Sequence, residues 1–102
     1  MKQKFRIELL DAAVEFLNEL EEKPREKIYY NLKKAQFSND NTLFKKLNSE
    51  IWEFRTLYKK TQYRLFAFWD KTRKIDTIVI STHGIEKKTK KTPRKEIDKA
   101  EI

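Results

Sequence analysis

The segment from residue 51 to residue 82 constrains the fold most, because three β-type stretches follow one another there at short spacing. They cover residues 51–58, 63–69 and 75–82, and each is rich in β-branched and aromatic side chains. Polar residues separate them at 59–62 and 70–74. Connections this short join antiparallel neighbours. The sequence therefore predicts an antiparallel meander, with the most apolar stretch, 63–69, in its centre.

The part before the meander predicts one short strand and two helices. Residues 4–9 alternate polar and apolar, as in a strand. The apolar spacing in residues 12–20 predicts an amphipathic helix, with Asp11 as the expected N-cap. Pro24 fits the first turn of a second helix, which fades in the loop-forming residues 38–41. The apolar positions at helical spacing are Ala13, Phe16, Leu17 and Leu20 in the first helix and Ile28, Leu32 and Ala35 in the second.

These elements predict an α+β fold. An N-terminal helical hairpin is expected to pack on the antiparallel sheet, and a short C-terminal helix to begin at or near Pro93. A chain of 102 residues has room for one hydrophobic core, so we expect a single domain over 1–102.

The composition excludes several classes of site. The chain has no Cys, which rules out disulfide scaffolds, zinc ribbons and thiol catalysis. A single His excludes an all-histidine metal site, and a single Gly excludes glycine-rich phosphate loops. No apolar run approaches the roughly 20 residues that span a bilayer, and no apolar leader follows Met1. We expect a cytoplasmic protein that uses no metal or cofactor and has no membrane partner.

The net charge of +8 is unevenly distributed. Residues 8–26 hold seven acids and two bases, so the rest of the chain carries a charge of +13. The densest basic run is 87–95, with six bases and no acid. A lysine run can be merely a solvated surface that keeps a protein soluble. The alternative is that the basic half attracts a polyanion such as RNA.

Arg55 and Arg64 lie inside apolar strand segments, where a guanidinium is partly desolvated and needs a partner. That partner could be Glu53 or Asp76, or it could be a phosphate, which arginine binds bidentately. If the turn between the first two meander strands has an even number of residues, the two arginines project from the same face. With no acid between them they would repel each other unless an anion binds there.

Three motifs together resemble a known family. Trp-Glu-Phe-Arg stands at 52–55, Tyr-Arg-Leu-Phe at 63–66, and His-Gly-Ile-Glu-Lys-Lys-Thr-Lys-Lys-Thr-Pro at 83–93, followed by Glu-Ile-Asp-Lys-Ala-Glu at 96–101. In this order and spacing the chain resembles the phage-derived, HigB-like branch of the RelE/ParE toxin superfamily. Ile85 stands where relatives usually have an aromatic residue, and Phe54 where they have Leu.

The resemblance implies a fold of the microbial-ribonuclease type, with two helices on one face of the sheet and the site on the opposite, concave face. It implies the toxin of a type II toxin–antitoxin pair, which cleaves mRNA, commonly on the translating ribosome. The implied partners are mRNA, the ribosome and a cognate helix-turn-helix antitoxin that neutralises the toxin and represses the operon.

Metal-free RNA cleavage requires a general base, stabilisation of the phosphorane and a general acid. Arg55 and Arg64 are the candidates for binding the phosphate and its transition-state charge. His83 is a candidate base or acid because its unperturbed pKa lies near neutrality, although it could instead only cap a strand end. Lys87 and Lys88 could exchange protons as well as bind phosphate.

Further residues could bind RNA without taking part in the chemistry. The basic candidates are Lys90, Lys91 and Arg94, which would contact the phosphate backbone. Tyr63 and Tyr58 could stack on a base, or they could be packing residues at the edge of the core.

The sequence alone leaves two other functions open. One is a ParE-like protein that inhibits DNA gyrase without catalysis. The other is a non-catalytic, basic nucleic-acid-binding phage accessory protein, whose charge serves binding alone.

Overall fold

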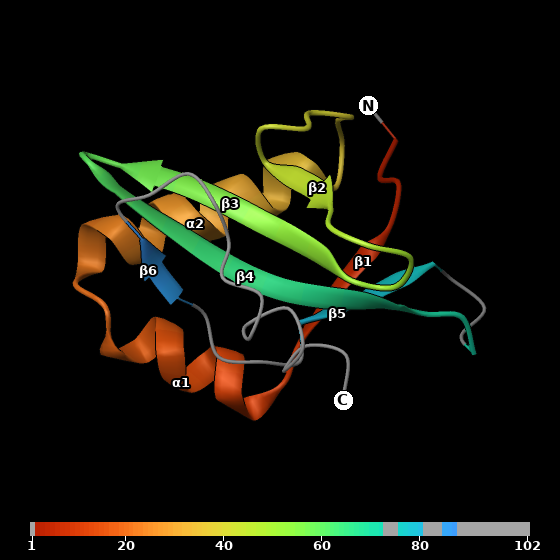
Figure 1. Ribbon diagram of the computed structural model, residues 1–102, viewed down its shortest axis with the longest axis horizontal. Coiled ribbons are helices and arrows are strands. Elements are labelled where there is room, and N and C mark those ends of the chain that lie inside the picture. The colour runs from red at the N-terminus through yellow and green to blue at the C-terminus, as the bar shows by residue number, and fades with distance from the viewer. Residues whose placement is uncertain (1, 73–75, 81–84, 88–102) are drawn as a thin grey trace.

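The structure is a computed structural model that describes residues 2–72, 76–80 and 85–87. Figure 1 shows how the elements are arranged within these ranges. In chain order they are β1 (Arg6–Leu9), α1 (Asp11–Glu19), α2 (Glu22–Ala35), β2 (Phe44–Lys46), β3 (Trp52–Tyr58), β4 (Thr61–Asp70), β5 (Thr77–Ile80) and β6 (Ile85–Lys87).

The predicted meander forms the centre of the sheet. The strand order is β1-β5-β4-β3-β2, and β6 pairs with β4 beside this path. The β3–β4 and β4–β5 pairs are antiparallel, and β4 is central, so the prediction for the meander is confirmed. The sheet as a whole is mixed, because β1 runs parallel to β5. The α+β class is confirmed, and the parallel pair is a long-range contact that the local pattern did not indicate.

The two predicted helices are present, although the expected cap of the first is wrong. Leu10 is the N-cap of α1 and makes no side-chain capping hydrogen bond, whereas Asp11 is the first helical residue. There its carboxylate still interacts favourably with the positive end of the helix dipole. Helix α2 begins at Glu22, which places Pro24 in its first turn as predicted.

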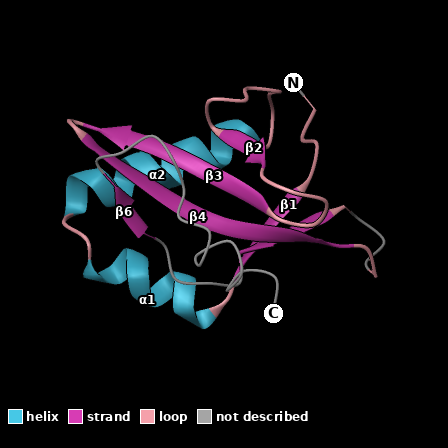
Figure 2. Ribbon diagram, viewed as in Figure 1, coloured by secondary structure: helices cyan, strands magenta, loops and turns pink. Residues whose placement is uncertain are grey.

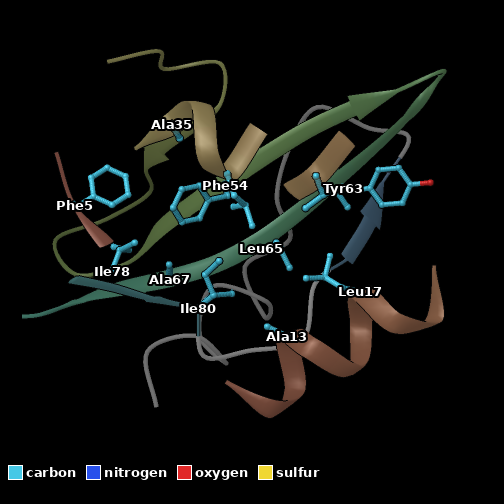
Figure 3. Close-up of a cluster of buried hydrophobic side chains, with 12 residues drawn as sticks. Phe5, Ala13, Leu17, Ala35, Phe54, Tyr63, Leu65, Ala67, Ile78 and Ile80 are labelled. Carbon is cyan, nitrogen blue, oxygen red and sulfur yellow. The ribbon is translucent and has the colours of Figure 1, made fainter. Parts of the chain in front are cut away.

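Both helices pack on the same face of the sheet. In Figures 1 and 2, α2 passes behind β3 and α1 lies below β4. The buried cluster between the helices and the sheet joins the predicted helix positions to alternate strand residues (Figure 3). Its buried members are Phe5, Ala13, Leu17, Ile28, Leu32, Ala35, Phe54, Tyr63, Leu65, Ala67, Ile78 and Ile80. The intervening residues of β3 and β4 therefore project from the opposite face, where the arginines are.

The turn between β3 and β4 is shorter than the sequence predicts. Thr61 and Gln62 already belong to β4, so only Lys59 and Lys60 connect the two strands. Lys59 has φ 54°, in the left-handed region that favours glycine. The two-residue turn has an even number of residues, which was the condition for placing the two arginines on one face.

The conformation of Lys59 predicts the effect of a substitution. Lys59→Gly is expected to raise the free energy of unfolding by about 0.5 kcal/mol, because relief of the Cβ clash exceeds the entropy that glycine adds to the unfolded chain. Chemical denaturation measures this change. Lys60→Gly is the matched control, since Lys59 is the one described non-glycine residue with positive φ. We expect the control to lose a similar amount, and equal effects of both variants would contradict the explanation.

Two short strands were not predicted. β2 and β6 have three residues each, too few to show a hydrophobic period. β2 pairs with the outer edge of β3. β6 pairs with the first part of β4, from Gln62 to Arg64. The predicted C-terminal helix from Pro93 lies outside the described residues.

Candidate nucleic-acid interface

Arg55 and Arg64 lie directly opposite each other on neighbouring strands. The antiparallel register pairs Arg55 of β3 with Arg64 of β4. Directly opposed residues project from one face, so the prediction that the two side chains share a face is confirmed. This is the face opposite to α1 and α2.

A carboxylate lies between the two arginines, and it belongs to Glu53, one of the two acidic partners considered from the sequence. Arg55 Nε is 3.2 Å from Glu53 Oε1, and Arg64 Nη1 is 3.6 Å from Glu53 Oε2. Arg64 Nη2 also donates a hydrogen bond of 2.7 Å to Gln62 Oε1. We call Glu53, Arg55, Gln62 and Arg64 the arginine cluster. Of the two carboxylates considered as partners, Glu53 is the one that binds both guanidinium groups.

The members of the arginine cluster differ sharply in exposure. The side chains of Arg64 and Glu53 are each 1% exposed, whereas that of Arg55 is 23% exposed. Burial lowers the pKa of Arg64, Glu53 raises it again, and the nearby charge of Arg55 lowers it further. Arginine nevertheless stays protonated in proteins. The cluster therefore holds two positive charges and one negative charge, and Arg55 is its accessible cation.

The geometry leaves Arg55 able to contact a ligand and restricts Arg64 to contacts within the protein. Arg55 can direct a guanidinium toward a ligand while its Nε remains beside Glu53. Arg64 is enclosed and binds Glu53 and Gln62 within the protein. Buried side chains held in this way fix the position of an exposed neighbour, which suits a preorganised anion site.

Three residues of this region had no place in the predicted site. Glu53 was considered only as an alternative partner, and Gln62 was assigned to the turn. Lys45 is exposed on β2 and lies opposite Glu53, so it shares the face of the arginine cluster. The spacing of Glu53 and Arg55, two residues apart in a strand, could have indicated the ion pair. The position of Lys45 depends on β2, for which the sequence has no clear pattern.

Tyr63 and Tyr58 lie on the other face of the sheet. Tyr63 is buried, and Figure 3 shows its ring beside Leu17 of α1. Tyr58 is half-buried and packs against the same cluster. Both tyrosines pack against the core on the helix side of the sheet, and the structure does not bring them together with Arg55. Their role in RNA binding stays a prediction.

A family model matches residues 15–102, which is most of the chain, and its description is phage-derived protein Gp49-like (DUF891). The chain belongs to the Gp49-like family. This family is a RelE/toxin-like group, and the α+β fold is compatible with the RelE-like fold that the motifs imply. No curated protein and no solved structure matches the chain. Membership is compatible with the toxin of a toxin–antitoxin system.

The match includes the arginine cluster and the basic block at 87–95. In this Gp49-like protein, Lys87 is the last residue of β6, and its backbone lies opposite Gln62 of the cluster. β6 thus brings the start of the basic block to the strand that carries Arg64. The other predicted residues of that block, namely His83, Lys88, Lys90, Lys91 and Arg94, lie outside the described residues, and their roles stay predictions.

Neither α1 nor α2, the helices of the described ranges, is long and apolar enough to cross a bilayer.

Proposed function

We propose that this protein is a HigB-like toxin of a type II toxin–antitoxin pair that cleaves mRNA on translating ribosomes. The observation that carries the proposal is the arginine cluster. Its two guanidinium groups share a single carboxylate, and one of the guanidinium groups is partly exposed. A site with an excess of positive charge and an accessible planar donor suits the phosphodiester backbone of RNA. Membership of a toxin-like family supports the same function.

In the proposed reaction, Arg55 binds the scissile phosphate. The 2′-oxygen of the preceding ribose attacks phosphorus as a general base removes its proton, and the 5′-oxygen leaves as a general acid protonates it. Arg55 stabilises the charge that develops on the non-bridging oxygens. Arg64 and Glu53 act as positioning residues, because both are buried and hold each other and Arg55.

The proton transfers are assigned to residues after β5. His83 is proposed as one proton-transfer group, with Lys87 or Lys88 as the other, because histidine titrates near neutrality and clustered cations lower the pKa of a lysine. Lys90, Lys91 and Arg94 are proposed to bind the RNA or ribosome backbone. The cognate partner is proposed to be a helix-turn-helix antitoxin, whose gene should neighbour that of this protein.

Mapping of mRNA 5′ ends in translating cells tests the proposal. The wild type, Arg55→Ala, His83→Ala and a control, Lys23→Ala, are expressed at equal levels. Lys23 is exposed at the start of α2, so the control should cleave like the wild type. We expect new, codon-linked ends with the wild type and their loss with Arg55→Ala and His83→Ala.

Two other outcomes would contradict the proposal and point to different functions. Intact mRNA together with altered DNA supercoiling would indicate a ParE-like gyrase inhibitor. Intact mRNA with normal supercoiling would indicate a non-catalytic, basic accessory protein.

A further inference from the structure

A third cation lies beside the arginine cluster, on the edge strand β2. The register places Lys45 directly opposite Glu53, so Lys45 projects from the face that carries Arg55 and Arg64. Its side chain is exposed. Within the part of the chain that the structure describes, no carboxylate forms an ion pair with Lys45. Lys45 and the arginine cluster together therefore hold three positive charges and one negative charge.

Arg55 keeps donor groups that can reach a ligand. Its Nε is 3.2 Å from Glu53 Oε1, and no other described residue binds its guanidinium. A guanidinium has five N–H donors in one plane, so Arg55 has donors left for a phosphate. Arg64 cannot do the same, because its side chain is 1% exposed. Of the three cations, Arg55 and Lys45 are thus the accessible ones.

The spacing of Arg55 and Lys45 suits two neighbouring phosphates. Glu53 lies opposite Lys45 and two residues before Arg55, so Lys45 and Arg55 are diagonal neighbours across β2 and β3. Diagonal neighbours have Cα atoms about 7–8 Å apart. Neighbouring phosphates of a single RNA strand have a separation of the same order, and a long lysine side chain can adjust to it. Glu53, which lies between the two cations, is 1% exposed and presents little negative charge to a ligand.

We propose that Lys45 binds a phosphate next to the one that Arg55 binds, so that an RNA strand crosses β3 toward β2. This step rests on the proposed function, because it takes RNA as the ligand of Arg55. β2 forms the outer edge of the sheet beside β3 (Figure 1), and no described strand lies beyond it. The RNA can therefore leave the sheet over Lys45 without meeting a further strand. Each of the two contacts neutralises one backbone charge and releases a counterion.

Lys46 is the matched control for Lys45. It is the next residue of the same strand, it is also exposed, and it carries the same charge. The register places Lys46 opposite Trp52, whose side chain packs against the buried cluster on the helix side of the sheet. Lys46 therefore projects from the other face. Replacing either lysine by Ala changes the net charge by the same amount, and only Lys45→Ala changes the face of the arginine cluster.

Binding of short oligonucleotides to the full chain tests the proposal. The probes are a trinucleotide with two phosphates and a dinucleotide with one, and both carry 2′-methoxy groups, which remove the nucleophile of the proposed cleavage. Nuclear magnetic resonance titration in low salt measures both affinities. We expect Lys45→Ala to bind the trinucleotide roughly threefold to tenfold more weakly than the wild type does, and the dinucleotide equally well. Lys46→Ala should bind both probes as the wild type does.

The salt dependence gives a second measure of the same contact. For a single strand, each phosphate contact contributes about 0.7 to the slope of log K against log salt concentration. The slope for the trinucleotide should therefore decrease by about 0.7 in Lys45→Ala and stay unchanged in Lys46→Ala. Equal losses in the two variants would indicate general electrostatic attraction and overturn the proposal. Equal affinities of the wild type for the two probes, or full trinucleotide affinity of Lys45→Ala, would overturn it as well.

The binding test is independent of RNA cleavage, because neither probe can be cleaved. If mRNA ends stay unchanged in cells while Lys45→Ala loses affinity for the trinucleotide, the cleavage proposal fails and the Lys45 contact stands. If codon-linked ends appear while Lys45→Ala binds the trinucleotide normally, the Lys45 contact fails and the cleavage proposal stands.

Discussion

Replacing Glu53 by Gln is expected to lower the free energy of unfolding by about 3–5 kcal/mol, the usual cost of removing one partner from a buried ion pair. Glu53 is the shared carboxylate of the arginine cluster, and its side chain is 1% exposed. In the Glu53→Gln variant, Arg64 stays buried and loses the negative charge that residue 53 supplied. A neutral amide cannot supply that compensation.

Urea denaturation followed by tryptophan fluorescence measures the effect. Glu50→Gln is the control, because Glu50 is exposed in the loop before β3 and should change the stability by no more than about 0.5 kcal/mol. Arg64→Met should cost less than Glu53→Gln, since it removes the buried cation and leaves Glu53 beside Arg55. Equal stability of Glu53→Gln and the wild type would show that the cluster does not support the fold.

Arg55→Ala is expected to reduce the rate of mRNA cleavage about 10²- to 10³-fold, the usual effect of losing one donor that stabilises a developing negative charge. The side chain is partly exposed, so its removal should change the free energy of unfolding by less than about 1 kcal/mol. Arg55→Lys keeps the positive charge and loses the planar guanidinium. Its cleavage rate should lie between those of the wild type and Arg55→Ala.

Single-turnover cleavage of mRNA on purified translating ribosomes provides the measurement. The matched control is Lys60→Ala, which removes an exposed cation at the tip of the same hairpin. A similar rate loss in this control would indicate general electrostatic attraction of RNA instead of a specific phosphate contact. An active Arg55→Ala variant would exclude Arg55 from the chemistry.

The sequence predicts those elements whose hydrophobic period repeats several times. The helix positions from Ala13 to Ala35 and the three strands of the meander have this property, and all reach the buried cluster as expected. β2 and β6 are too short to show a period. The parallel pairing of β1 with β5 joins distant segments, and no local preference encodes such a contact.

The sequence predicts which residues of the candidate site lie opposite each other, and it does not predict which of them are buried. Strand alternation and turn parity place Arg55 opposite Arg64. The enclosure of Arg64 depends on what packs around it, which one strand's pattern does not contain. Gln62 was missed because four polar residues in a row, 59–62, resemble a longer turn, whereas the left-handed conformation of Lys59 allows the strand to begin two residues earlier.

The parallel β1–β5 pair has a consequence for biosynthesis. Arg6 finds its partner Thr77 only after the intervening chain has been made, which takes roughly 4–14 s at about 5–20 residues per second. During that interval β1 has no β5 to pair with. The helices α1 and α2 have no complete sheet on which to pack. A messenger cut upstream of codon 77 would leave a polypeptide that lacks Thr77 and cannot form this pair.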